Sequence, residues 1–353
     1  MKTDIKSLTF EQLNKELSEL SLPSFRTGQI FKWLHENGCS DFSEMTNLSK
    51  NLRNVLSEKY YISDCSIENK FISEIDDTVK YLFRLNDGEY IESVVMKYKY
   101  GYTICVSSQV GCKMGCTFCA STLAGFCRNL TSGEIESQIH SAQKDLNIRI
   151  SHIVMMGIGE PLDNFDNVLT FLKNVNDSKG LNISMRNVTI STCGIVPKIY
   201  ELMERNLQIT LTISLHAPND KIRSKTMPVN NKYNMDKLIE ACREYGRRTG
   251  RRVSFEYTLI KGVNDSEKDA LELSQKLKGI LCHVNLIPVN DVKERNNERS
   301  SQPDIFKFQN VLKRNGINAT IRRTLGSDIN ASCGQLRRLK KRGDLCEDCC
   351  QNR

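Results

Sequence analysis

The spacing of apolar positions changes along the chain. In the first 60 residues they recur every three to four positions, as at Phe10, Leu13 and Leu17, which predicts amphipathic helices on either side of Pro23. From about residue 65 strand-forming residues take over, and the turn sequence Asn86–Gly88 predicts a β-hairpin. The strands of this hairpin are expected at Val79–Leu85 and Tyr90–Met96.

Beyond residue 100, short apolar runs alternate with helical patterns. One of these helices is expected to begin near Thr131, because Thr131 and Glu134 have the spacing of a capping box. Six strand–helix units in succession predict a parallel sheet with right-handed crossover connections. The six strands are expected at Thr103–Ser107, Ile153–Met156, Val188–Thr192, Ile209–Leu215, Val253–Leu259 and His283–Ile287.

These changes of pattern divide the 353 residues into four parts. We expect a helical accessory domain at 1–62, a β-hairpin module at 63–97, a large α/β domain at 98–345 and a cysteine-containing tail at 346–353. The helical pattern leaves open whether the accessory domain contacts a nucleic acid or only packs against the larger domain.

A hydrophobic content of 39% and a charged content of 26% are typical of a soluble globular protein. No apolar stretch resembles the core of a signal peptide or reaches the length of a membrane span. We therefore expect a cytoplasmic protein without a membrane partner. Its 14 cysteines are then expected to be reduced thiols and not a disulfide framework.

The net charge of +8 is concentrated in short basic runs. Clustered cations bind phosphates with release of counterions, so a polyanionic partner such as RNA is compatible with these runs. A solvated surface is an equally good interpretation of any single run. The runs are Arg247–Arg252, Arg322–Arg323 and Arg337–Arg342.

Three cysteines, Cys112, Cys116 and Cys119, form a compact C-x3-C-x2-C group. Three thiolates on a four-iron cluster leave one iron open to a substrate, whereas electron carriers use four protein ligands. Zinc is the alternative, but a structural zinc site needs four ligands and this loop has three close thiols. The spacing therefore favours an iron–sulfur cluster that takes part in chemistry.

A second group of thiols, Cys346, Cys349 and Cys350, lies in the tail. It could bind zinc through its C-x2-C spacing, or it could remain a flexible reduced tail. The second interpretation is favoured because two or three ligands at a chain terminus do not complete a zinc site.

The cysteine triplet with Phe118 before its last member is the signature of the radical S-adenosylmethionine (SAM) enzymes. With four further segments, the chain resembles the RlmN branch of the RlmN/Cfr family, adenine methyltransferases that act on 23S ribosomal RNA and transfer RNA. The resemblance implies an α/β fold, a radical SAM partial (β/α)6 barrel with an N-terminal helical accessory domain and a small β-hairpin module. The four segments are Cys105–Gly111, Gly159–Pro161, Ser214–Pro218 and Ala331–Leu336.

The resemblance implies a [4Fe-4S] cluster and two molecules of SAM per turnover as cofactors. The free iron of the cluster would bind SAM, and Gly159 and Glu160 would meet the ammonium group of SAM. The site residues follow or end predicted strands, where barrels of this kind have their active sites. The cluster ligands would be Cys112, Cys116 and Cys119, and the carboxylate and ribose of SAM would be held by Ser191, Ser214, Leu215, His216 and Asn290.

The resemblance also implies three catalytic residues. Cys333 would take a methyl group from one SAM, and the 5′-deoxyadenosyl radical from a second SAM would remove a hydrogen from the methylated cysteine. The resulting carbon radical would add to C2 of adenine, and Glu92 would accept the C2 proton. Cys105 would then attack the sulfur of Cys333 and release the methylated RNA from the covalent adduct, with a transient disulfide as the result.

The implied substrates are an adenine of the peptidyl transferase centre in 23S ribosomal RNA and the adenine 3′ of the anticodon in transfer RNA. We also expect a reductant such as flavodoxin or ferredoxin, and a monomer. Two alternatives stay open: a Cfr-type enzyme that methylates C8 of the ribosomal adenine, and a non-catalytic, metal-stabilised RNA-binding protein. The flanks Gln109–Cys112 and Ala120–Leu123 resemble the C2 branch, and the distant pair Cys105 and Cys333 counts against a non-catalytic role.

Overall fold

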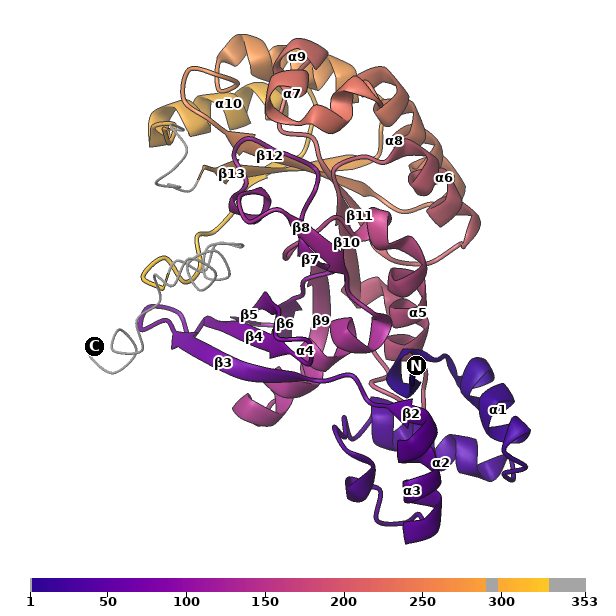
Figure 1. Ribbon diagram of the computed structural model, residues 1–353. Coiled ribbons are helices and arrows are strands. Elements are labelled where there is room, and N and C mark those ends of the chain that lie inside the picture. The colour runs from indigo at the N-terminus through magenta and orange to yellow at the C-terminus, as the bar shows by residue number, and fades with distance from the viewer. Residues whose placement is uncertain (1, 290–297, 330–353) are drawn as a thin grey trace.

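One curved sheet of ten strands organises the computed structural model, which describes residues 2–289 and 298–329 (Figure 1). The strands are β3 (Cys65–Ile72), β4 (Val79–Leu85), β5 (Tyr90–Tyr98), β6 (Gly101–Cys105), β9 (Ile150–Met155), β10 (Val188–Thr192), β11 (Thr210–Ser214), β12 (Val253–Leu259), β13 (Cys282–Pro288) and β14 (Ala319–Ile321). Their order is β14-β13-β12-β11-β10-β9-β6-β5-β4-β3. The strands from β6 to β14 are parallel, and β5, β4 and β3 continue the sheet in antiparallel pairs.

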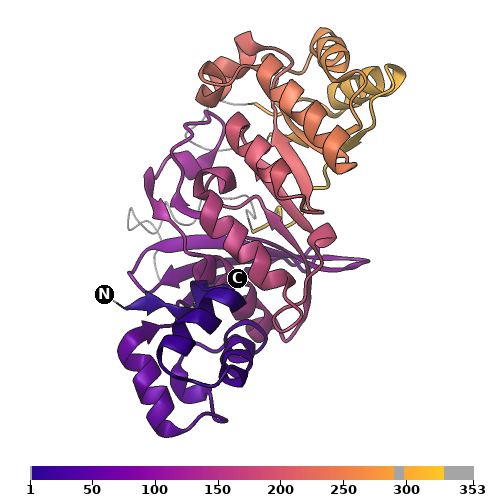
Figure 2. The same ribbon diagram turned by 90° about the vertical axis from the view of Figure 1, so that its right-hand side faces the viewer.

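Helices follow the parallel strands and cover the outer face of the sheet (Figure 2). The helix after β6 begins where the capping box predicts, because the Thr131 hydroxyl accepts from the Glu134 amide and the Glu134 carboxylate accepts from the Thr131 amide. The helices of this part are α4 (Ser132–Leu146), α5 (Phe165–Asn176), α6 (Val196–Glu204), α7 (Asp220–Thr226), α8 (Met235–Thr249), α9 (Glu267–Leu277) and α10 (Gln302–Arg314).

Burial alternates along β10 and β13, as the period of a β-strand predicts. In β13, Val284 and Leu286 are fully buried, whereas Asn285 and Ile287, which alternate with them, are half-buried. The buried rows pack with the apolar faces of the helices in one large core. The alternate rows line the inner, concave face, which is where polar side chains of several strands are brought together.

The N-terminal residues form a helical unit with a core of its own, in which Leu13, Ile30, Phe31 and Leu56 are fully buried or nearly so. This unit lies beside the α4 and α5 side of the sheet (Figures 1 and 2). Its elements are β1 (Thr3–Asp4), η1 (Ile5–Ser7), α1 (Phe10–Glu19), α2 (Phe25–His35), η2 (Phe42–Glu44), α3 (Lys50–Lys59) and β2 (Tyr60–Tyr61).

The segment after β14 crosses from one edge of the curved sheet back to the other (Figure 1). Asp328 accepts hydrogen bonds from the Ser73 hydroxyl at 2.7 Å and from the Glu74 amide at 2.9 Å. The Gly326 amide also donates to Asp76 at 2.9 Å. These contacts tie the segment to the turn between β3 and β4, so the opening between the sheet edges is spanned on that side.

The predicted α/β fold and its six parallel strands are confirmed. The sequence pattern missed β14, because three residues are too few to show an alternation. The hairpin is also confirmed, but β5 pairs with β6 in the same sheet, so the division at residue 97 stays a prediction. In the part of the chain that the structure describes, no helix has both the length and the apolar character of a membrane span.

Candidate active site

The cysteine triplet lies in a loop between two short strands at the carboxyl ends of the parallel strands. β7 (Gln109–Gly111) and β8 (Phe126–Asn129) pair in antiparallel fashion, and η3 (Ala120–Thr122) closes the loop between them. The Thr117 amide donates to the Thr226 carbonyl at 2.9 Å, which fixes the loop against the end of α7. Cys116 packs with Cys193 and Met227 in a small apolar cluster.

The three thiols are close enough to affect one another electrostatically. Burial raises the pKa of Cys112 to about 12, and Cys119 adds to this increase. Burial also raises the pKa of Cys116, which Cys119 and Cys112 raise further. Three thiolates at this position therefore require a compensating cation, and the donor set suits an iron–sulfur cluster. Among the described residues, no three His, Cys, Asp or Glu side chains converge on a single-ion site.

Glu160 lies at the end of the connection that follows β9, beside the cysteine loop. Its carboxylate is buried and accepts hydrogen bonds from the Leu162 amide at 3.0 Å and from the Cys193 amide at 2.7 Å. Burial raises the pKa of Glu160, and these bonds oppose the increase. The carboxylate thus joins the ends of β9 and β10, and its negative charge suits a cationic group such as an ammonium.

Gly159 has a φ of +109°, and a Cβ atom there would lie 2.8 Å from the Gln109 amide nitrogen. The close approach to Gln109 therefore requires glycine whether or not a cofactor is bound. Gln109 also accepts from the Glu160 amide at 2.9 Å and donates to Asp163 at 2.7 Å. It was not recognised as part of the site from the sequence.

Ser191 and Ser214 end neighbouring parallel strands, and their hydroxyl oxygens lie 3.5 Å apart. The adjacent Leu215 is buried, and its carbonyl accepts from Arg223 at 3.2 Å. Arg223 is fully buried and also donates to the Cys193 carbonyl at 2.6 Å and to the Ser214 carbonyl at 3.2 Å. This arginine holds the ends of β10 and β11 together. Nothing in the sequence around Arg223 distinguishes it from an arginine on the surface.

His216 has a left-handed backbone, with a φ of +54°, although it is buried. Its Nδ1 accepts from the Thr258 amide at 2.9 Å, so the neutral ring carries its proton on Nε2. Burial lowers the pKa of His216 to about 3, and Arg223 contributes. The ring meets Phe118 of the cysteine loop edge to face, with centroids 4.8 Å apart. A strained backbone held this way is a feature of functional sites.

Glu92 and Cys105 lie on the same face of the sheet. Cys105 is opposite Val94 in the pairing of β5 with β6, and Glu92 is two residues from Val94 on the same side. Glu92 forms a buried ion pair with Lys80, with Nζ and Oε2 separated by 3.1 Å. Burial raises the pKa of Cys105 to about 11; Arg322 and Lys80 oppose the increase, and Glu92 adds to it. Charged groups from β4, from β5 and from the segment after β14 therefore all affect the pKa of this thiol.

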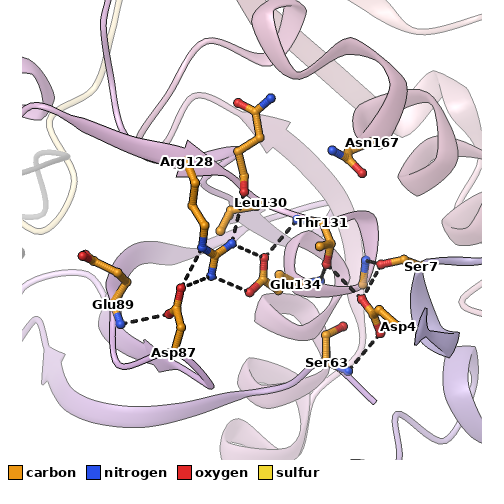
Figure 3. Close-up of polar contacts among 12 residues, drawn as sticks. Asp4, Ser7, Ser63, Asp87, Glu89, Arg128, Leu130, Thr131, Glu134 and Asn167 are labelled. Carbon is orange, nitrogen blue, oxygen red and sulfur yellow. Dashed lines mark hydrogen bonds and ion pairs between the residues drawn. The ribbon is translucent and has the colours of Figure 1, made fainter. Parts of the chain in front are cut away.

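A polar network joins β8, the strand that follows the cysteine loop, to the N-terminal unit (Figure 3). Arg128 of β8 donates to both carboxylate oxygens of Glu134 at 2.8 Å and to Asp87 of the β4–β5 turn at 2.7 Å. Thr131, the first residue of the capping box, donates to Asp4 at 3.0 Å. Arg128 thereby connects β8 with the first turn of α4 and with the β4–β5 turn. Asp4 of the N-terminal unit contacts the residue that caps the same helix.

Several predicted residues cannot be placed. Asn290, Cys333, the run Arg337–Arg342 and the tail cysteines lie outside the described residues. The ten cysteines that the structure describes are all free thiols, Cys105 included, so the expected disulfide is not supported.

The run Arg247–Arg252 lies at the amino end of β12, opposite the cysteine loop. Arg248 pairs with Glu204 at 2.5 Å, and Arg251 donates to the Ile209 carbonyl at 3.3 Å. Arg247 also pairs with Glu244 at 3.7 Å, so internal contacts occupy three of the four arginines in this run. These contacts favour the solvated surface as the interpretation of this run.

Comparisons with known proteins agree with this arrangement. Residues 106–274 match the model of the radical SAM superfamily, and residues 3–62 match the ribosomal RNA large subunit methyltransferase N-terminal domain. The crystal structure of a radical SAM methyltransferase from Sphaerobacter thermophilus superposes with a TM-score of 0.89 at 41% identity and covers 94% of this chain and 98% of that one. The fold and the cysteine loop therefore define a radical SAM enzyme.

Curated relatives narrow the class. The chain is 54% identical to the probable dual-specificity RNA methyltransferase RlmN of Clostridium novyi (strain NT) over 95% of this chain and 98% of that protein. It is 56% identical to the protein of the same description from Alkaliphilus oremlandii (strain OhILAs) over 96% and 98%. The chain belongs to the RlmN family of radical SAM RNA methyltransferases.

Proposed function

We propose that this protein methylates C2 of adenine in 23S ribosomal RNA and in transfer RNA. The names of its relatives state a dual-specificity RNA methyltransferase. The observation that carries the proposal is the position of Glu92 and Cys105 on one face of the sheet, beside the opening that the segment after β14 spans. A carboxylate and a thiol at this position can act on the same covalent adduct, the carboxylate on the C2 proton of adenine and the thiol on the sulfur of Cys333. The segment continues toward Cys333 in the sequence.

In this proposal Cys112, Cys116 and Cys119 hold the [4Fe-4S] cluster. The cluster and SAM, when bound, supply the electron, the methyl group and the radical chemistry. His216, Ser191 and Ser214 lie on the side of the cysteine loop where SAM would be bound, with His216 held in place by the Thr258 amide. Asn290 is proposed to complete the SAM site.

Each catalytic residue then has one task. Cys333 carries the methyl carbon to the adenine, Glu92 takes the proton from C2, and Cys105 attacks the Cys333 sulfur to free the product. Because the pKa of the Cys105 thiol is raised to about 11 by burial, it needs to lose its proton during the attack. Lys80 and Arg322 are the cations whose charges favour that loss.

Mass spectrometry of nucleosides tests the proposal directly. Anaerobically purified protein with a reconstituted cluster is incubated with 23S ribosomal RNA or transfer RNA, SAM and a reductant, and the RNA is digested. We expect 2-methyladenosine from both RNAs. Formation of 8-methyladenosine would assign the protein to the C8 branch, and the absence of any methylated adenosine alongside RNA binding would favour the non-catalytic alternative.

A further inference from the structure

Aromatic side chains gather at the end of the active-site face that is opposite the cysteine loop. The rings of Tyr98 and Tyr100 stack with centroids 5.0 Å apart and planes 6° from parallel. Tyr100 also meets His152 edge to face at 4.7 Å. Tyr98 ends β5, Tyr100 lies in the β5–β6 turn, and His152 is in β9. We call these three residues the aromatic platform.

The aromatic platform belongs to the same face of the sheet as the proposed catalytic residues. The Tyr98 hydroxyl contacts the Met96 sulfur at 3.7 Å, and side chains two residues apart share one face of a strand. Val94, two residues further along, is opposite Cys105. His152 is opposite Thr103, which is two residues before Cys105 on the same face of β6. A continuous row therefore runs from Tyr98 to Glu92.

Exposure separates the aromatic platform from an ordinary core cluster. Tyr100 is 61% exposed, although a tyrosine stacked on another aromatic ring could bury most of its surface. More than half of its surface is thus open to solvent, which leaves room for contact with a further ring. Base–aromatic stacking accepts any base, because every base has a π-face, and proteins that bind single-stranded nucleic acid use exposed tyrosines in this way.

Two arginines that follow β14 act electrostatically on Tyr98 of the aromatic platform. Burial and Tyr100 raise the pKa of Tyr98, while Arg322 and Arg323 oppose the increase, so both guanidinium charges act on its hydroxyl. Both arginines are exposed, and they follow β14 at the edge of the opening. Aromatic rings beside clustered arginines are complementary to the bases and phosphates of an unpaired RNA segment.

We propose that the aromatic platform stacks an unpaired base of the RNA substrate that flanks the target adenine, and that the two arginines bind the adjoining phosphates. This inference rests on the proposed function, because it takes Glu92 and Cys105 as the place of the target adenine. Tyr98 lies four residues from Val94, a distance of about 13 Å along the strand. A stacked strand rises about 3.4 Å per nucleotide, so a few nucleotides span that distance.

The test compares Tyr100→Ala with Tyr100→Phe, which keeps the ring. The control is Phe306→Ala, which removes an aromatic residue of similar exposure, 52%, from the outer helix α10. Fluorescence anisotropy measures binding of an RNA hairpin with an unpaired loop adenine. Loss of one stacked base is expected to weaken binding about 5- to 150-fold for Tyr100→Ala, with little change for the other two variants.

Arg322→Gln tests the phosphate contact in the same assay. The slope of affinity against salt concentration is expected to fall by about one for this variant, because one phosphate contact is lost. An unchanged slope would overturn the role of this arginine. Thermal unfolding of all variants is measured in parallel, and Tyr100→Ala is expected to unfold with the wild-type midpoint because its side chain is exposed.

The outcomes separate this inference from the proposed function. Wild-type affinity of Tyr100→Ala for the hairpin would overturn the stacking site, and equal weakening by Tyr100→Phe would show that the ring is not what binds. Either result leaves the methylation assay of the wild-type protein untouched. If the wild-type protein binds the hairpin but methylates no adenosine, the proposed function fails, and the binding comparison still decides the stacking site.

Discussion

Replacing Lys80 by Met removes the cation that faces Glu92 and leaves the carboxylate buried. The two side chains are 0% and 1% exposed, and the charged atoms are 3.1 Å apart. Breaking one side of such a pair costs about 3 to 5 kcal/mol, because the remaining charge stays buried after the opposite charge of the pair is removed. Lys80→Met is therefore expected to lower the free energy of unfolding by about 3 to 5 kcal/mol.

A double-mutant cycle separates the ion pair from loss of packing. Glu92→Gln alone leaves the ammonium group buried and is expected to be destabilising too. The variant Lys80→Met with Glu92→Gln contains neither charge, so it is expected to be more stable than the sum of the single changes by about 2 kcal/mol or more. The two variants that lack Glu92 are expected to methylate no adenosine, because the proposed base is missing.

Urea unfolding followed by circular dichroism measures all four members of the cycle at one pH. Lys198→Met is the matched control, because Lys198 pairs with Glu201 at 2.7 Å where the side chains are 35% and 46% exposed. Its effect should be no more than about 1 kcal/mol. The reasoning is refuted if Lys80→Met is as stable as this control, or if the double variant loses as much as the two single changes together.

Three further predictions concern other parts of the chain. Cys105→Ala should accumulate a covalent RNA adduct on a denaturing gel while Cys333→Ala forms none; normal turnover by Cys105→Ala would contradict the release role. Arg128→Gln loses a two-oxygen contact with Glu134 and should cost about 1 to 2 kcal/mol in urea unfolding, whereas an effect equal to that of an exposed pair would show that the network contributes nothing. The pKa of His140 is lowered to about 4, chiefly by burial, so the folded protein binds fewer protons than the unfolded chain below about pH 6.5. The free energy of unfolding is therefore expected to be about 2 kcal/mol lower at pH 5 than at pH 7.5 because of this residue. If urea titrations show the same difference for His140→Gln, this residue is not the cause.

Local patterns were sufficient for much of the fold. The strand at Tyr90–Met96, the turn at Asn86–Gly88 and the capping box at Thr131 each depend on neighbours within a few residues, so the sequence alone predicted them. The class of the active site was also predictable, because the spacing of three cysteines in one loop indicates an iron–sulfur cluster before the fold is known.

Contacts between distant segments were not predictable from a single sequence. Arg223 looks like a surface cation by its neighbours in sequence, and only the meeting of β10 and β11 buries it beneath their carbonyl groups. Lys80 pairs with Glu92 because the register of the hairpin places Lys80 opposite Val94, and Glu92 lies two residues from Val94 on the same face of β5.

The sequence by itself determined the hairpin, the alternation of six strands with helices, the three-thiol loop and the family resemblance, because these are properties of short segments. The tertiary structure alone decided that Tyr100 stacks on Tyr98 beside arginines from the far edge of the sheet. It also decided that a segment after β14 spans the opening. The physical reason is that the curvature of a sheet depends on all its strands together, and curvature is what brings β14 and β5 to the same opening.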